Sequence, residues 1–280
     1  MEGSHLPLVP TRCGDTEFRW GERTYVMGVL NLSPDSFSGD GLGSDMEPIV
    51  AEARRLVAEG ADIVDIGGES TRPGSQPIPA EEELRRVIPA IKGLASEVSV
   101  PLSIDTCKSE VAGRAVEAGA RMINDVWGLK QDRKLAQVAS EAGVPIVLAS
   151  NQRDSTMHCD IIVEVISSLE RSISLAIKAG VAEQNIIIDP GIGFGKSVEQ
   201  NLTIIRRLAE LKVLRRPILL GTSRKFMTSQ APDQRLEATA ATVAIGIAHG
   251  ADMMRVHDVR QMVRVCRMSD TIIRRRTNEL

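Results

Sequence analysis

The feature that most constrains this chain is an alternation, repeated eight times, of a short apolar run and an amphipathic stretch of helical length. Strict alternation of strand and helix predicts a parallel sheet, and eight repeats predict that the sheet closes into a barrel. We therefore expect an α/β protein, a (β/α)8 TIM barrel over about residues 25–276, within one domain that spans residues 1–280.

The expected elements follow directly from the apolar pattern. The predicted strands are Tyr25–Leu30, Asp62–Ile66, Pro101–Ile104, Arg121–Ile123, Pro145–Leu148, Asn185–Ile188, Pro217–Leu220 and Asp252–Val256. The predicted helices are Met46–Glu59, Ala80–Glu97, Ser109–Ala118, Asp132–Ala142, Ile161–Ala179, Val198–Leu211, Leu236–His249 and Val259–Arg276.

A doubly wound open sheet is the alternative architecture, but such sheets usually have fewer strands and a glycine-rich turn after the first strand. No G-x-G-x-x-G pattern follows Leu30. Thr11–Glu22 precedes the first barrel strand, and we expect an N-terminal β-hairpin there that plugs the bottom of the barrel. A glycine that can end a helix recurs at four helix-to-strand junctions, which favours one repeating domain: Gly60, Gly119, Gly143 and Gly180.

Composition narrows the class of protein. Aromatic residues are only 2% of the chain, so the core must be aliphatic, which suits buried parallel strands. A formal net charge of -3 argues against a dedicated nucleic-acid binder. The four cysteines are scattered, which predicts free thiols in a reducing cytosol. Met1–Pro10 lacks a signal pattern and no apolar run is long enough for a membrane span, so we expect a cytoplasmic protein without membrane contact.

Polar residues follow nearly every predicted strand. Active sites of TIM barrels form at the carboxyl ends of the strands, so these residues should converge on one rim. Carboxylates and amides suit one side of the rim to a neutral hydrogen-bonding heterocycle, and the cations beside Asn31 suit the other side to a phosphate or pyrophosphate. The rim candidates are Asn31, Asp105, Asn124, Asp189, Lys225, Arg255 and His257.

Seven ordered motifs resemble the dihydropteroate synthase family, over roughly Val26 to Met262. They are residues 27–38 (MGVLNLSPDSFS), 65–74 (DIGGESTRPG), 103–106 (SIDT), 123–125 (IND), 189–196 (DPGIGFGK), 221–225 (GTSRK) and 255–258 (RVHD).

The resemblance implies an enzyme that joins 6-hydroxymethyl-7,8-dihydropterin pyrophosphate to p-aminobenzoate, with Mg²⁺ as cofactor, and that forms a homodimer. Sulfonamides would inhibit such an enzyme. The pterin would be held by Asp105, Asn124, Val126, Asp189 and Lys225. The pyrophosphate would be held by Asn31, Arg255 and His257, with Mg²⁺ at Asn31. The p-aminobenzoate site would be shaped by Phe37, Thr71, Arg72, Pro73 and Phe194.

The chain departs from the family pattern at two places that matter for the site. Ala149-Ser150-Asn151 stands where the family usually has Met-His-Asn, so a side-chain contact to the pterin is missing. Phe226 follows Lys225 at once, and the stretch to Glu237 is short. We hypothesise that the ring of Phe226 disfavours sulfonamides, which are bulkier than p-aminobenzoate.

Two other functions stay open from the sequence. The first is a pterin-binding methyltransferase domain of the same barrel type, which would act on methyltetrahydrofolate. It would need neither the motif at residues 70–73 nor the anion site at Arg255 and His257. The second is a non-catalytic pterin-binding paralogue, which the departures at Ala149 and Ser150 favour.

Overall fold

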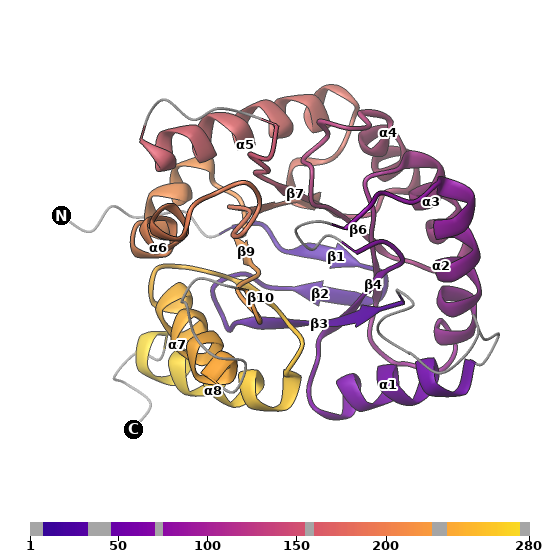
Figure 1. The fold of residues 1–280 in the computed structure, drawn as a ribbon, viewed down its shortest axis with the longest axis horizontal. Coiled ribbons are helices and arrows are strands. Elements are labelled where there is room, and N and C mark those ends of the chain that lie inside the picture. The colour runs from indigo at the N-terminus through magenta and orange to yellow at the C-terminus, as the bar shows by residue number, and fades with distance from the viewer. Residues whose placement is uncertain (1–7, 33–45, 71–74, 155–159, 226–233, 275–280) are drawn as a thin grey trace.

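The structure is a computed structural model that describes residues 8–32, 46–70, 75–154, 160–225 and 234–274. Eight parallel strands form the central sheet in the order β8-β7-β6-β5-β4-β3-β10-β9. A bridge between Ile188 and Ile218 joins β8 to the segment before β9 and completes the ring. Helices surround this ring of strands (Figure 1). The fold is a TIM barrel, as the eight repeats predicted.

The elements agree with the predicted ones to within a few residues at most ends. The barrel strands are β3 (Tyr25–Asn31), β4 (Ile63–Gly67), β5 (Leu102–Asp105), β6 (Met122–Asp125), β7 (Ile146–Ala149), β8 (Ile186–Asp189), β9 (Leu219–Leu220) and β10 (Met253–Val256). The helices are α1 (Met46–Ala58), α2 (Ala80–Leu94), α3 (Ser109–Ala118), α4 (Lys134–Ala142), α5 (Ile161–Lys178), α6 (Val198–Arg206), α7 (Arg235–Ala248) and α8 (Val259–Ile273).

Two predicted elements differ from the observed ones. The strand expected over Pro217–Leu220 is reduced to the two residues of β9, and Pro217 has no N–H to give to a neighbouring strand. The helix expected over Val198–Leu211 ends at Arg206, and a 3-10 helix, η3 (Leu208–Leu214), follows. Arg207 leaves helical geometry with φ -110° and ψ 17°, which separates the two pieces.

The predicted hairpin is confirmed. β1 (Thr11–Cys13) and β2 (Thr16–Phe18) pair antiparallel, and they lie across the middle of the ring of strands in Figure 1. Their side chains enter a buried cluster with inward-facing residues from the first part of the barrel strands. Trp20 donates from Nε1 to Thr11 Oγ1 (2.9 Å), which in turn donates to the carbonyl of Gln184 (2.6 Å). The hairpin therefore seals the amino-terminal end of the barrel.

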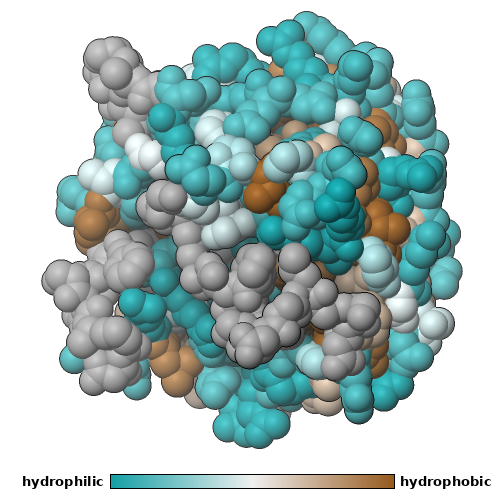
Figure 2. All heavy atoms as spheres, turned by 45° about the vertical axis from the view of Figure 1, so that its right-hand side comes forward, coloured by the Kyte–Doolittle hydropathy of each residue, from teal (hydrophilic) through white to brown (hydrophobic). Residues whose placement is uncertain are grey.

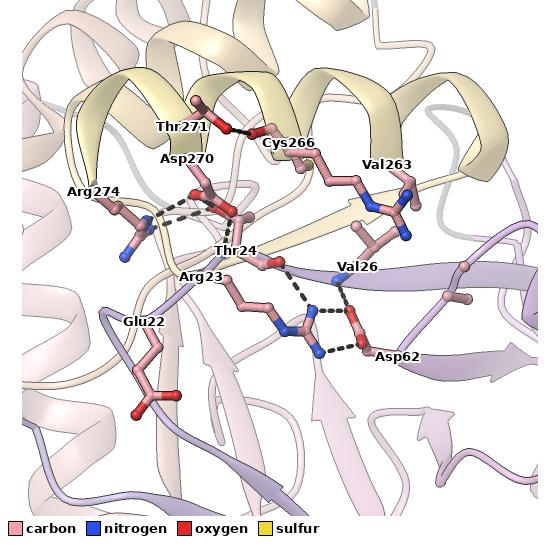
Figure 3. A pocket seen from close by; sticks show the side chains of 13 residues that line it. Glu22, Arg23, Thr24, Val26, Asp62, Val263, Cys266, Asp270, Thr271 and Arg274 are labelled. Carbon is pink, nitrogen blue, oxygen red and sulfur yellow. Dashed lines mark hydrogen bonds and ion pairs between the residues drawn. The ribbon is translucent and has the colours of Figure 1, made fainter. Parts of the chain in front are cut away.

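A cavity of about 1060 Å³ lies at that same amino-terminal end, between α8 and the starts of β3 and β4 (Figure 3). Several of the charged groups that line it are paired. Arg23 makes a two-bond ion pair with Asp62, and Asp270 accepts from the backbone N–H and the hydroxyl of Thr24 (both 2.7 Å). These contacts fasten α8 to the barrel bottom, at the opposite end from the predicted rim.

The surface in Figure 2 is mainly hydrophilic, with small separate hydrophobic spots on the face it shows. Larger exposed apolar side chains occur on the last two helices, among them Ile245 on α7 and Met268 and Ile272 on α8. Among the described residues, none of the helices has the length and apolar character that a membrane crossing requires.

Candidate active site

Strand alternation brings the predicted rim residues to the inside of the barrel. Side chains two residues apart on a strand face the same way, and the interior apolar residues Met122, Ile187 and Met253 each precede a polar residue by two positions. Those polar residues are Asn124, Asp189 and Arg255. In the register of the sheet, Asp105 lies opposite Asn124 on the neighbouring strand, and Arg255 lies opposite Met27. The carboxyl half of the barrel interior is therefore polar, above an apolar lower half.

Small residues alternate with the polar ones around this mouth. A Cβ placed on Gly67 would lie 3.7 Å from Asn31 Oδ1 and 3.8 Å from Asp105 Oδ2. One placed on Gly221 would lie 3.6 Å from Lys225 Nζ and 4.0 Å from Asp189 Oδ2. Ala149 stands opposite Asp189 in the pairing of β7 with β8. Three strand ends therefore contribute space instead of side chains, and the polar groups surround that space.

Arg255 lies between two buried carboxylates. Its Nε donates to Asp65 Oδ2 (2.6 Å) and its Nη2 donates to Asp105 Oδ2 (2.6 Å). Asn124 Nδ2 donates to the same Asp65 oxygen (3.0 Å). The expectation that cations and carboxylates occupy opposite sides of the rim is therefore wrong for Arg255, because attraction between opposite charges in a poorly solvated interior draws them together.

Asp65 was not among the predicted site residues, although its side chain is fully buried at the centre of this cluster. The prediction considered only polar residues at or beyond the end of each apolar run, and Asp65 lies in the middle of one. Side chains two residues apart on a strand face the same way. Asp65 is two residues before Gly67, which faces the mouth of the barrel, so the side chain of Asp65 also faces the barrel interior. The sequence could have indicated Asp65 through this spacing.

Burial governs the protonation of these groups. It raises the pKa of Asp105 to about 7; the charge of Arg255 opposes this shift and that of Asp65 adds to it. Burial works against the charge of Arg255 too, but Asp65 and Asp105 raise the pKa of that guanidinium. The cluster thus keeps a permanent cation beside a carboxyl that can titrate near neutral pH.

Asp189, Lys225 and Phe194 form a second group, beside β8. Asp189 accepts from the N–H of Gly191 (2.7 Å), while Lys225 donates to the carbonyl of Ile192 (2.7 Å). The Lys225 ammonium also lies 4.6 Å from the centre of the Phe194 ring. Burial lowers the pKa of Lys225 to about 8, although Asp189 favours the charged form. This group brings together a carboxylate, an ammonium and an aromatic face from the ends of two neighbouring strands, β8 and β9.

His257 is fixed through Ser223. The backbone N–H of His257 donates to Ser223 Oγ (3.1 Å), and the ring Nδ1 lies 3.0 Å from the same oxygen. The structure gives Ser223 a supporting contact, because it orients the imidazole at the end of β10.

Lys196 is a further residue that the prediction did not include as a site. Its Nζ donates to the carbonyls of Ser150 (2.6 Å) and Gly191 (2.9 Å) and reaches that of Phe194 (3.4 Å). Burial lowers its pKa to about 7. Lys196 thus joins the end of β7 to the loop that carries Phe194. Ser150, which departs from the family pattern, and the neighbouring Asn151 are both fully buried.

Val126 keeps its side chain almost fully buried after β6, and its carbonyl accepts from Asn151 Nδ2 (3.1 Å). Asn31 ends β3 at the rim. Five residues discussed for the p-aminobenzoate side lie outside the described residues: Phe37, Thr71, Arg72, Pro73 and Phe226.

The described residues offer Mg²⁺ few ligands. Among the described residues no cluster of three His, Cys, Asp or Glu side chains could enclose a metal ion. Mg²⁺ commonly keeps several waters and binds through one or two protein oxygens plus substrate phosphates. Asn31 Oδ1, beside the open space above Gly67, suits that kind of coordination.

The fold is a TIM barrel whose polar residues gather at the carboxyl ends of its strands, an arrangement typical of barrel enzymes. The sequence profile described as "Pterin binding enzyme" matches residues 27–257, and the chain belongs to this family. A dihydropteroate synthase of Clostridium beijerinckii is 47% identical over 94% of this chain and 100% of its own length, and one of Bacillus subtilis is 45% identical over 90% of each.

Solved structures agree with this assignment. A dihydropteroate synthase from Clostridium difficile, in the presence of pteroic acid, superimposes with a TM-score of 0.89 at 45% identity, over 92% of this chain and 100% of the other. The enzyme from Xanthomonas albilineans in complex with 7,8-dihydropteroate gives 0.85 at 38% identity, over 94% and 98%.

Proposed function

We propose that the rim at the carboxyl ends of the strands is the active site of a dihydropteroate synthase reaction. The chain is a transferase of folate biosynthesis that condenses 6-hydroxymethyl-7,8-dihydropterin pyrophosphate with p-aminobenzoate, giving 7,8-dihydropteroate and pyrophosphate. The observation that carries the assignment of the site is the convergence of Asp105, Asn124, Asp189 and Lys225 on one mouth that small residues leave open.

The pterin fits the space bounded by Asp105, Asn124 and Asp189. A reduced pterin is planar and rich in N–H donors, and buried carboxylates and an amide oxygen are the acceptors it needs. Val126 and Lys225 border the same space. Ala149 adds no bulk opposite Asp189, so the ring can approach the strand itself.

The chemical step breaks the bond between the pterin methylene and the pyrophosphate oxygen, and forms a bond from that methylene to the aniline nitrogen. Departure of pyrophosphate leaves positive charge on the methylene and the conjugated ring. Fixed carboxylates at Asp105 and Asp189 stabilise that charge. The amine then attacks and releases a proton to solvent. No nucleophilic side chain takes part in this scheme.

The leaving group is assigned to Arg255, His257 and Asn31. Arg255 is charged at every relevant pH, and Ser223 orients His257 toward the end of β10. Asn31 would hold Mg²⁺, and the ion would neutralise charge on the departing pyrophosphate.

The p-aminobenzoate site is assigned to Phe194 together with Phe37, Thr71, Arg72 and Pro73. Support from the described residues comes from Phe194, whose ring centre lies 4.6 Å from Lys225 Nζ and 4.9 Å from Arg153 Cζ. Cations beside an aromatic side chain suit a benzoate, because a cation can bind the carboxylate of the ligand while the aromatic side chain packs on its ring.

The decisive experiment is product formation by the purified chain with both substrates and Mg²⁺. We expect stoichiometric 7,8-dihydropteroate and pyrophosphate, and loss of turnover in Asp189→Asn. Binding of pterin pyrophosphate without turnover would favour the non-catalytic paralogue instead. Methyl transfer from methyltetrahydrofolate would favour the methyltransferase.

Two properties of the whole protein belong to this proposal. A homodimer is supported by the exposed apolar side chains of α7 and α8; Met268 and Ile272 are four residues apart and share a face of α8. Ile272→Arg should yield a monomer in sedimentation experiments.

A cytoplasmic location is supported by the free thiols of Cys13, Cys107 and Cys266.

Sulfonamide inhibition follows from the same assignment, since these drugs resemble p-aminobenzoate. We retain the hypothesis that Phe226 weakens it. Sulfamethoxazole inhibition constants of the wild type and Phe226→Ser test this hypothesis, and equal constants would refute it.

A further inference from the structure

Three arginine side chains of this protein use Nε and Nη2 together to bind one carboxylate. Arg55 does so with Glu52, Arg207 with Glu210 and Arg224 with Asp258. This edge of a guanidinium matches both oxygens of a single carboxylate. Arg255 differs, because it divides the same edge between two residues: Nε binds Asp65 and Nη2 binds Asp105.

The divided grip leaves an acceptor unused. Asp65 receives Arg255 Nε and Asn124 Nδ2 on one oxygen, Oδ2. Its second oxygen, Oδ1, is fully buried and has no hydrogen-bond partner among the described residues. An unsatisfied buried carboxylate oxygen carries a free-energy cost, so a state that pairs this oxygen is favoured locally.

We propose that Asp65 is a positioning residue that receives both donors of Arg255 when Asp105 turns to the pterin. A small rotation moves Nη2 from Asp105 Oδ2 to Asp65 Oδ1 and produces the two-bond pair seen elsewhere in the chain. Asp105 is then free to accept from the pterin. The outer N–H groups of Arg255 stay available for the pyrophosphate, so the two substrate halves are bound in a coupled way.

This inference rests on the proposed function, because it assigns the pterin to Asp105 and the pyrophosphate to Arg255. It adds Asp65 as the residue through which the two are linked. Asp65 also holds Asn124, so one buried carboxylate fixes a neighbour in each part of the site. The exchange forms and breaks hydrogen bonds only and involves no proton transfer.

The test is Asp65→Asn, which keeps the shape of the side chain and removes its charge. We expect KM for the pterin substrate to rise at least about tenfold and kcat to fall, with KM for p-aminobenzoate changed by less than about twofold. Pyrophosphate alone, measured by calorimetry, should bind more weakly. Removal of a negative charge by itself would instead tighten pyrophosphate binding, so tighter binding would overturn the proposal.

A double-mutant cycle with Arg255→Lys tests whether Asp65 acts through Arg255. A lysine has no planar edge and cannot make the exchange. We expect the double variant to be little worse than Arg255→Lys alone, whereas additive losses would contradict the proposal.

Asp62→Asn is the matched control. It removes a carboxylate from the residue just before the same strand, where Asp62 pairs with Arg23 at the barrel bottom, and its kinetic constants should equal those of the wild type. If the wild type itself makes no dihydropteroate, the proposed function fails. If the wild type is active and Asp65→Asn matches it, only the role of Asp65 fails.

Discussion

Ser223 and His257 come from adjacent strand ends, and one hydroxyl oxygen meets the second residue twice: at 3.1 Å from its backbone nitrogen and 3.0 Å from Nδ1 of its ring. Such a contact fixes both the position and the rotation of the imidazole. Ser223 has no chemical role of its own in the proposed reaction, but it positions His257, which is assigned to the pyrophosphate.

Ser223→Ala should therefore weaken binding of the pterin pyrophosphate. Loss of one supporting hydrogen bond of about 1 kcal/mol corresponds to an increase of about fivefold in KM. KM for p-aminobenzoate should not change, because that ligand does not depend on His257. Steady-state kinetics with each substrate varied in turn measures both, and equal increases in the two constants would contradict the assignment.

The pH dependence of kcat/KM should show a narrow maximum. Burial raises the pKa of Asp105 to about 7 and lowers that of Lys225 to about 8. The reaction needs Asp105 ionised and Lys225 protonated, so activity should rise with pH up to about 7 and fall above about 8. Lys225→Arg keeps its charge at high pH and should lose the alkaline fall; a flat profile from the wild type would count against both roles.

Lys196→Met should lower the stability of the protein. The substitution leaves the carbonyls of Ser150 and Gly191 without the ammonium that now donates to them. We expect a loss of about 1–3 kcal/mol in the free energy of unfolding, measured by denaturant titration. Lys134→Met, at an exposed position that begins α4, is the control and should change stability little. Equal stability of the two variants would show that the junction does not need Lys196.

Gly191→Ala should damage both stability and activity. Gly191 has a φ of +71°, and a Cβ there would lie 2.0 Å from the carbonyl oxygen of Ser150. The cost should exceed about 2 kcal/mol, and displacement of the Gly191 N–H would release Asp189.

Gly113→Ala is the matched control for that variant. Gly113 lies within α3, and a Cβ there would meet nothing within 4 Å. The same change should stabilise the protein by up to about 1 kcal/mol. A similar loss in both variants would contradict the argument from backbone geometry.

The barrel was predictable because its signal repeats. Each apolar run of a buried strand and each amphipathic helix is local in the sequence, and eight of them agree. The two-residue β9 was overestimated, because the run at Pro217–Leu220 is apolar whether or not its backbone pairs.

Site residues were predictable where a polar side chain lies at or just beyond a strand end. Asp105, Asn124 and Asp189 follow the predicted strands, and Arg255 is the last but one residue of its strand. The ion pairs of Arg255 were not predictable, since they join residues 190 and 150 positions apart across the barrel. Lys196 was missed for another reason: its acceptors are backbone carbonyls, which a sequence does not distinguish.

The sealed barrel bottom has a practical consequence for watching this protein in solution. The chain contains two tryptophans, and they lie at opposite ends of the barrel. Trp20 follows the hairpin and contacts the rings of Phe18 and Tyr25, whereas Trp127 follows the carboxyl end of β6. Two variants that each keep one tryptophan would thus provide two separate fluorescent probes. Trp20 would report on detachment of the N-terminal hairpin, and Trp127 would report on ligands that bind at the mouth.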